Sequence, residues 1–502
     1  IFGRSARLMY GGYTAPGCLP EPAALLNDYS TLSQQVNGPG KRLRVTASFI
    51  SRGEQGLGPV VIWALPTVWV GLDVLRGSLF TGFPWQDLGY SQYSLPLLLQ
   101  TAELTGHHGI TFIIVLVNGL AALLLTRVAG FVRRPHPNPS LISGGSKRQN
   151  RQAASLAAAL LLLCAFLLYG RLSLKEAEEE IALAPRLRAA FIQGNIAQEV
   201  KWEPEQQIAT VERYLNLSRK ALEARPQLVV WPETALPFYP DTHPLFKTIT
   251  AFARHNRTSL LIGAPHRQIE SSGETSYFNS AILVGEESDK EKPPIYHKQH
   301  LVPFGEYIPL RKVLPFFAPV VETLGDFTPG PGPVVLNHQG GRLGVLICFE
   351  AIFPELARKL TANGADLLIN ITNDAWFGRS GAPHQHLAMT VLRAVENRRS
   401  LVRAANTGIS AFITPDGRIW QATRLFTSDQ RSFDLPLPRR EKGDTPEIEE
   451  RRQDGKPQIP LTFFNSTGYL FGPTCLLLLI AGIIQQAYVK LVARNRGPDN
   501  QN

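Results

Sequence analysis

The sequence predicts a layered α/β domain placed between membrane-spanning helices. From about residue 188 to residue 413, short apolar runs typical of buried strands alternate with amphipathic stretches typical of helices. On both sides of this region the chain has long apolar stretches with few charges, and each approaches the ~20 residues that cross a bilayer.

The strands and helices of the middle region follow from the spacing of apolar residues. Strands are predicted at residues 189–192, 228–231, 260–263, 280–284, 343–347, 365–371, 401–404 and 410–413. Helices are predicted at 205–224, 354–363 and 384–397, where apolar residues recur with helical periodicity. This alternation favours a layered α/β fold.

Four membrane helices are predicted outside the middle region. They cover about 58–75, 110–128, 153–169 and 467–488. The first contains Pro59 and Pro66 and ends near Asp73, so a buried helix of a soluble domain is its alternative.

The distribution of basic residues predicts the orientation of these helices. The segment from Arg127 to Arg151 carries several basic residues and no acidic one, so we expect it to stay in the cytoplasm. The next helix then runs outward and places the middle domain on the far side of the membrane. The basic tail after Lys490 agrees. The net charge of +10 is therefore assigned to lipid headgroups, and no nucleic-acid partner is expected.

Three residues in the middle region suggest a site of nucleophilic catalysis. Glu233 and Cys348 each end an apolar run, and Lys298 lies in a Pro-rich loop. A thiolate that attacks an acyl carbonyl needs a base for its proton and donors for the developing oxyanion. Glu233 suits the first role, and Lys298 with the N–H after Cys348 suits the second. The alternative is that Cys348 is an inert, buried thiol.

These residues, in this order, resemble the Glu-Lys-Cys constellation of the nitrilase superfamily. Within that superfamily, six segments resemble the bacterial apolipoprotein N-acyltransferases: 80–85, 192–195, 231–235, 301–307, 347–350 and 373–378. The order of membrane helices, middle domain and one last helix is also similar.

The resemblance implies a nitrilase-like αββα sandwich flanked by transmembrane helices, in a multi-pass protein of the bacterial inner membrane with a periplasmic catalytic domain. It implies that Cys348 takes an acyl chain from a phospholipid as a thioester. The acceptor is the N-terminal amine of a diacylglyceryl apolipoprotein. No cofactor is expected, and the chain is expected to be a monomer.

The resemblance also assigns roles to single residues. Glu233 is the general base and acid, and Lys298 stabilises the oxyanion. Glu306 and Glu350 are expected to orient Lys298 and the thiol, and the N–H of Phe349 is expected to complete the oxyanion hole.

Three further assignments are weaker. Trp376 and Phe377 are candidates for the acyl site, with core packing as the alternative. His384 and His386 are separated by one residue and have no clear third ligand, so no metal site is predicted. Phe80 to Trp85 is expected to anchor at the membrane interface.

The predicted domain boundaries divide the chain into an unassigned N-terminal segment, a membrane region, a catalytic domain, a linker, a last membrane helix and a cytoplasmic tail. These are residues 1–57, 58–172, 173–435, 436–466, 467–490 and 491–502. Two rival functions remain at this point. One is a membrane-tethered nitrilase or amidase that hydrolyses a small C–N substrate, and the other is a non-catalytic binding module.

Overall fold

The computed structural model describes residues 59–133, 146–269, 273–285, 293–307, 327–439 and 461–495. The predicted N-terminal segment 1–57, the middle of the basic segment after Arg127 and most of the predicted linker lie outside these residues.

One six-stranded sheet is formed by the first five strands of the middle domain together with its last strand. Its order is β12-β1-β2-β3-β4-β5, with β1 (Arg186–Gln193), β2 (Leu228–Val230), β3 (Ser259–Ile269), β4 (Thr275–Val284), β5 (Ile295–His297) and β12 (Asp429–Pro436). β1, β2 and β3 are parallel, whereas β12, β4 and β5 are added in antiparallel orientation.

The second six-stranded sheet is built in the same way. Its order is β11-β10-β9-β8-β7-β6, with β6 (Val335–Leu336), β7 (Leu343–Ile347), β8 (Leu367–Thr372), β9 (Ser400–Ala405), β10 (Ala411–Ile413) and β11 (Ile419–Trp420). β7, β8 and β9 are parallel, so their carboxyl ends lie at one edge of the sheet.

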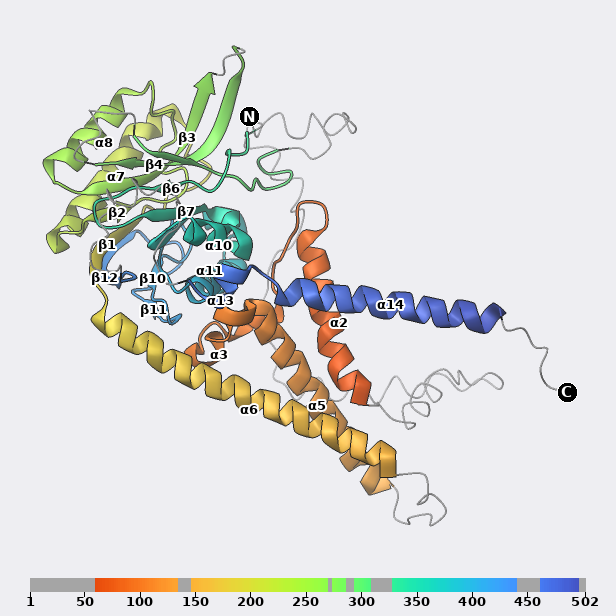
Figure 1. Ribbon diagram of the computed structural model, residues 1–502. Coiled ribbons are helices and arrows are strands. Elements are labelled where there is room, and N and C mark those ends of the chain that lie inside the picture. The colour runs from red at the N-terminus through yellow and green to blue at the C-terminus, as the bar shows by residue number, and fades with distance from the viewer. Residues whose placement is uncertain are drawn as a thin grey trace, which may run out of the picture. The chain divides into compact units, whose positions relative to one another are not determined.

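The two sheets pack face to face, and helices cover their outer faces (Figure 1). Phe191 and Val230 of the first sheet share a buried core with Val345 and Ile369 of the second. The outer face of the first sheet packs on α7 (Gln207–Ala221) and α8 (Pro244–His255), and that of the second on α10 (Pro354–Ala362) and α11 (Ala382–Asn397). The predicted αββα sandwich is confirmed.

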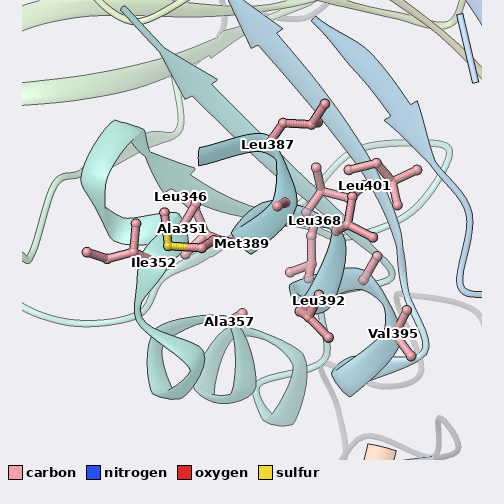
Figure 2. Close-up of a cluster of buried hydrophobic side chains, with 14 of the residues drawn as sticks. Leu346, Ala351, Ile352, Ala357, Leu368, Leu387, Met389, Leu392, Val395 and Leu401 are labelled. Atoms are coloured by element: carbon pink, nitrogen blue, oxygen red, sulfur yellow. The ribbon is translucent and has the colours of Figure 1, made fainter. Parts of the chain in front are cut away.

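The outer core of the second sheet holds α11 against the strands that carry the site. Figure 2 shows Leu346, Leu368 and Leu401, from three neighbouring strands, in one buried cluster with Met389 and Leu392 of α11. All five side chains are fully buried. Burial of each contributes about 1.5–3 kcal/mol, which fixes α11 on this sheet.

The eight predicted strands are all present, and the sequence missed four others. β5, β6 and β11 have only two or three residues, too few to show an alternating pattern. β12 lies at the edge of its sheet and begins with four polar residues, so it has no apolar run. α8 was also missed, although Pro244 opens it at a position that favours a helix start.

The membrane part consists of long helices joined by short helical turns. Its elements are α2 (Pro59–Ser78), η3 (Leu88–Gln92), α3 (Pro96–Leu99), α4 (Ala102–Thr105), α5 (His107–Arg133), α6 (Ser146–Leu183), α13 (Phe463–Thr467) and α14 (Phe471–Asn495). Three described segments are long and apolar enough to cross a membrane: His107–Leu125, Gln152–Leu183 and Phe471–Val492.

Two of the predicted membrane helices differ in detail from the described elements. The predicted span at 58–75 forms as α2, a largely apolar helix that contains Pro66, Asp73 and Arg76 and is not among the three candidate spans found in the described residues. The predicted span at 153–169 is part of α6, whose candidate span Gln152–Leu183 has 32 residues and ends in a charged stretch after Arg171. At ~1.5 Å per residue this exceeds a ~30 Å hydrocarbon layer, so α6 continues beyond it toward β1.

Polar contacts join this membrane part to the α/β domain. Glu103 of α4 accepts hydrogen bonds from the hydroxyl of Tyr169 in α6 at 2.7 Å and from Nε of Arg398, after α11, at 2.6 Å. All three side chains are at least partly buried. The two parts therefore meet through a specific, charged contact.

Gly263 in β3 lies against the turn that follows β2. A methyl group at this position would come within 2.2 Å of the carbonyl oxygen of Pro232 and 2.7 Å of the Cα atom of Glu233. We expect Gly263→Ala to lower the free energy of unfolding by about 1–3 kcal/mol through overpacking, measured as a lower Tm in detergent. Gly332→Ala, which meets nothing within 4 Å, is the control and should leave the Tm unchanged. An equal Tm for both variants would contradict this packing.

Candidate active site

Glu233, Lys298 and Cys348 come from three different loops, each of which follows a strand. Glu233 follows β2, Lys298 follows β5, and Cys348 follows β7. Glu233 and Lys298 are buried, and Cys348 is half-buried. The structure therefore brings together the three residues that the sequence singled out, between the two sheets at the strand ends.

The carboxylate of Glu233 is held by donors from both sheets. Its Oε1 accepts from Nδ2 of Asn279 in β4 at 2.8 Å, and its Oε2 accepts from the backbone N–H of Asn373, after β8, at 2.9 Å. Nζ of Lys298 is 3.5 Å from Oε1. The carboxylate is thus fixed in direction before any substrate binds.

Lys298 lies between two carboxylates. Its Nζ is 2.8 Å from Glu306 as well as 3.5 Å from Glu233. Burial by itself would lower the pKa of Lys298, but the charges of Glu306 and then Glu233 outweigh it and raise that pKa well above its usual range. Glu306 is oriented in turn by the N–H of Val302 at 2.9 Å. The lysine therefore stays protonated and available as an oxyanion partner.

Cys348 occupies a strained backbone position. Its φ of 52° lies in the left-handed region, and it begins the short helix η8 (Cys348–Ile352) directly after β7. Such a sharp strand-to-helix turn presents a side chain at the sheet edge. Burial, and then the charge of Glu233, raise the pKa of the thiol, so the resting group is a neutral thiol.

Glu350 connects the nucleophile turn to the lysine loop. Its two carboxylate oxygens accept from the backbone N–H groups of Ile347 and Gln299, both at 2.7 Å, and from the hydroxyl of Tyr296 at 3.0 Å. Burial raises the pKa of Glu350 to about 7, although these donors oppose the shift. Its hydrogen bonds thus join the turn that carries Cys348 to the loop that carries Lys298.

The sequence missed two polar residues that support the site. Asn279 donates to both Glu233 and Glu306 through Nδ2. Lys201 is buried, and its Nζ lies 2.6 Å from Oγ1 of Thr234 and 3.4 Å from the carbonyl oxygen of Glu233. Burial lowers the pKa of Lys201 to about 8. Neither residue belongs to one of the six motif segments, and no local pattern indicates them.

The structure separates the two histidines of α11. His384 is exposed, whereas His386 is buried and lies 3.1 Å, through Nε2, from the carbonyl oxygen of Cys348. Nδ1 of His386 lies 3.1 Å from Asp374, which also pairs with Arg403 at 2.7 Å. His386 therefore supports the nucleophile turn through its backbone.

Aromatic residues from the membrane part line this turn. Phe83 stacks on Phe349 with 5.9 Å between ring centroids, and Trp85 lies 5.6 Å from Phe377. Trp376, by contrast, is 69% exposed. The two aromatic residues predicted for an acyl site thus differ: Phe377 packs beside Trp85, and Trp376 faces outward.

The segment 80–85 was expected to anchor at the membrane interface. Its aromatic residues also differ from one another in exposure and packing. Phe80 is fully exposed, as an anchor requires. Phe83 and Trp85 instead pack against the loops around Cys348, and Nε1 of Trp85 donates to Gln385 at 2.8 Å. The segment therefore also forms part of the site wall.

The catalytic domain has known relatives. Residues 188–439 match the family model described as carbon-nitrogen hydrolase, and this stretch contains both sheets together with Glu233, Lys298 and Cys348. The domain is thus a carbon-nitrogen hydrolase domain. Residues 43–120 match a second model, described as the apolipoprotein N-acyltransferase N-terminal domain.

Curated relatives extend this assignment to most of the chain. It is 45% identical over 388 residues to apolipoprotein N-acyltransferase of Geobacter metallireducens, covering 76% of this chain and 69% of the relative. It is 38% identical over 366 residues to that of Azotobacter vinelandii, covering 72% and 65%. The chain belongs to the apolipoprotein N-acyltransferase family, as its motifs predicted, and spans about two thirds of the length of these relatives.

A solved structure, that of carbon-nitrogen hydrolase from Helicobacter pylori G27, is similar at a TM-score of 0.38 and 18% identity. It covers 50% of this chain and 89% of its own. This structural similarity is too weak to support any statement about the fold.

Glu350→Gln tests whether this carboxylate fastens the two loops. Both oxygens of Glu350 now accept hydrogen bonds from backbone N–H groups. In the Glu350→Gln variant one oxygen is replaced by an NH₂ group, which cannot accept, so one buried backbone N–H is left without a partner. We expect a loss of about 1–3 kcal/mol in the free energy of unfolding, followed as a lower Tm. Glu355→Gln, on the surface of α10, is the control. A Tm equal to that of the control would contradict the role of Glu350.

Proposed function

We propose that this chain transfers a fatty acyl chain from a phospholipid, through a thioester on Cys348, to the N-terminal amine of diacylglyceryl-cysteine in an apolipoprotein. The observation that carries the proposal is the protonated Lys298, buried with Glu233 at the strand ends beside Cys348, in a chain of the apolipoprotein N-acyltransferase family. The same residues suit a nucleophile, a base and an oxyanion partner.

In the first step Glu233 accepts the thiol proton while Sγ of Cys348 attacks the ester carbonyl carbon of the phospholipid. A base is required because the thiol is neutral at rest. Lys298 and the N–H of Phe349 stabilise the oxyanion. The ester C–O bond then breaks, and the lysophospholipid leaves with the proton from Glu233.

In the second step the free α-amine attacks the thioester carbonyl. Glu233 accepts a proton from the amine, the C–S bond breaks, and the proton passes to the departing thiolate of Cys348. An amide forms and the thiol is restored. Because the acyl group is carried by the enzyme between two substrates, the kinetics are ping-pong.

The membrane attachment suits two lipid substrates. Each buried CH₂ of an acyl chain is worth about 0.8 kcal/mol, so neither substrate leaves a bilayer readily. Phe80 and Trp376 are exposed aromatic side chains in segments that also contribute to the site wall. We place the catalytic domain on the periplasmic side of the bacterial inner membrane, because the segment from Arg127 to Arg151 is basic and free of acidic residues.

The thioester gives a direct test. Purified protein incubated with phosphatidylethanolamine labelled in its acyl chains should acquire a label that hydroxylamine removes. Cys348→Ala should acquire none, because the atom that carries the acyl group is missing. Cys164→Ser and Cys475→Ser are matched controls in the membrane helices and should be labelled as the wild type is.

The same experiment distinguishes the acyltransferase from the amidase alternative. An unlabelled wild-type protein that releases ammonia from a small amide would refute the acyltransferase proposal. Labelling that persists in Cys348→Ala would refute the nucleophile assignment alone.

Glu233 and Lys298 should each be needed for the rate. We expect Glu233→Gln and Lys298→Met to lower kcat/KM for acyl transfer at least ~10²-fold, the usual scale for a general base or an oxyanion donor. Lys359→Met, an exposed lysine on α10, should leave it unchanged. A loss below tenfold in either site variant would contradict its role.

A further inference from the structure

A second buried polar cluster lies outside the active site, where the membrane part meets the catalytic domain. It consists of Asp87, His107 and His108, which are all at most 3% exposed. One ligand atom from each residue lies within 4.8 Å of the others. The acyl-transfer chemistry uses none of these residues.

The cluster is assembled by the tertiary structure. Asp87 precedes η3, and the two histidines open α5. Neighbouring residues on a helix do not normally face the same way. Here both rings turn toward the one carboxylate, with 4.1 Å between ring centroids.

The inner atoms of the cluster converge on one point. Nε2 of His107 is 2.7 Å from Oδ2 of Asp87, and Nε2 of His108 is 3.2 Å from the same oxygen. Ligands bound to tetrahedral zinc at ~2.0–2.2 Å are separated from one another by roughly 3.3 Å. Small side-chain shifts would therefore admit an ion among these three atoms.

The outer atom of each residue faces another side chain. Oδ1 of Asp87 pairs with Arg76, and Nδ1 of His108 pairs with the hydroxyl of Tyr469. Nδ1 of His107 faces Oε1 of Glu396 at 3.6 Å. Metal ligands in proteins are oriented in this manner, with the second ring nitrogen of each histidine directed at an oxygen.

Two polar atoms beside the cluster are buried without a hydrogen bond. Nδ1 of His107 and Oε2 of Glu396 are buried and have no hydrogen-bond partner. If His107 donates from Nε2 to Asp87, the neutral ring has a lone pair on Nδ1 that faces a carboxylate. A metal on Nε2 moves the ring proton to Nδ1, where it points at Glu396.

The charged side chains around the cluster have a net negative charge when both imidazoles are neutral. Three carboxylates, those of Asp73, Asp87 and Glu396, lie with two guanidinium groups, those of Arg76 and Arg393. With neutral imidazoles the group has an excess of negative charge. A buried excess of this kind is unfavourable unless a cation pairs with it.

We propose that Asp87, His107 and His108 bind one divalent first-row transition metal ion, with zinc as the ion of choice and water in the open position. Two imidazoles and one carboxylate form a ligand set that such ions prefer. The ion fastens the start of α5 to the segment before η3. Through Glu396 and Tyr469 it also couples α5 to α11 and to the segment before α14.

Metal binding by the full-length chain tests this site without using activity. Protein purified in detergent without a histidine tag is stripped with chelator and titrated with Zn²⁺ against a chromophoric competitor. The wild type should bind about one equivalent, and Asp87→Asn and His108→Gln should lose this binding. His384→Asn, which removes an exposed histidine of α11, should bind as the wild type does.

A milder variant protects the test against misfolding. Tyr469→Phe removes one outer hydroxyl and no ligand, and it should weaken zinc affinity about 10–100-fold. Co²⁺ in the wild type should also give the intense visible absorption of a low-coordinate site. Wild-type protein that binds Zn²⁺ no better than Asp87→Asn, with the weak spectrum of hydrated Co²⁺, would overturn the proposal. A protonated His107 would then fill the network in place of a metal.

Discussion

The ammonium group of Lys298, buried between the carboxylates of Glu233 and Glu306, is the interaction on which the rest of the site depends. A buried lysine without such partners would lose its charge, and two buried carboxylates without the lysine would repel each other. The surrounding polar groups serve this triad: Asn279 donates to both acids, and Glu350 fastens the loop that carries the lysine. The chemistry therefore begins with a charge arrangement that is complete before substrate binds.

The backbone around this arrangement is held in unusual conformations. Cys348 and Thr234 both have positive φ, at 52° and 44°, and both follow strands of the core. Such positions cost about 1–3 kcal/mol each and persist only where the surroundings enforce them. The contact of His386 with the carbonyl of Cys348, and the Nζ of Lys201 beside Thr234, provide that enforcement.

The membrane part is more than an anchor for the catalytic domain. Phe83 and Trp85 pack on the loops that surround the thiol, and Glu103 binds Arg398 at the end of α11. A movement of the membrane helices would therefore reach the wall of the site through packed side chains. These contacts connect the membrane helices directly to the loops around the nucleophile.

The sequence by itself determined the layered α/β domain and its eight main strands, two of which are followed closely by Glu233 and Cys348. These features depend on local apolar periodicity, which the chain displays directly, whereas Lys298 was singled out by its loop and by the resemblance to a known constellation. The sequence did not indicate β12, the length of α6, Asn279, the buried contact of His386 or the convergence of Asp87 with two neighbouring histidines. Each of these depends on segments that are distant in the chain and are brought together when the two sheets and the helices bury their apolar faces. Only the tertiary structure decided them, because a hydrogen bond or a shared ligand position between distant residues leaves no periodic trace in sequence.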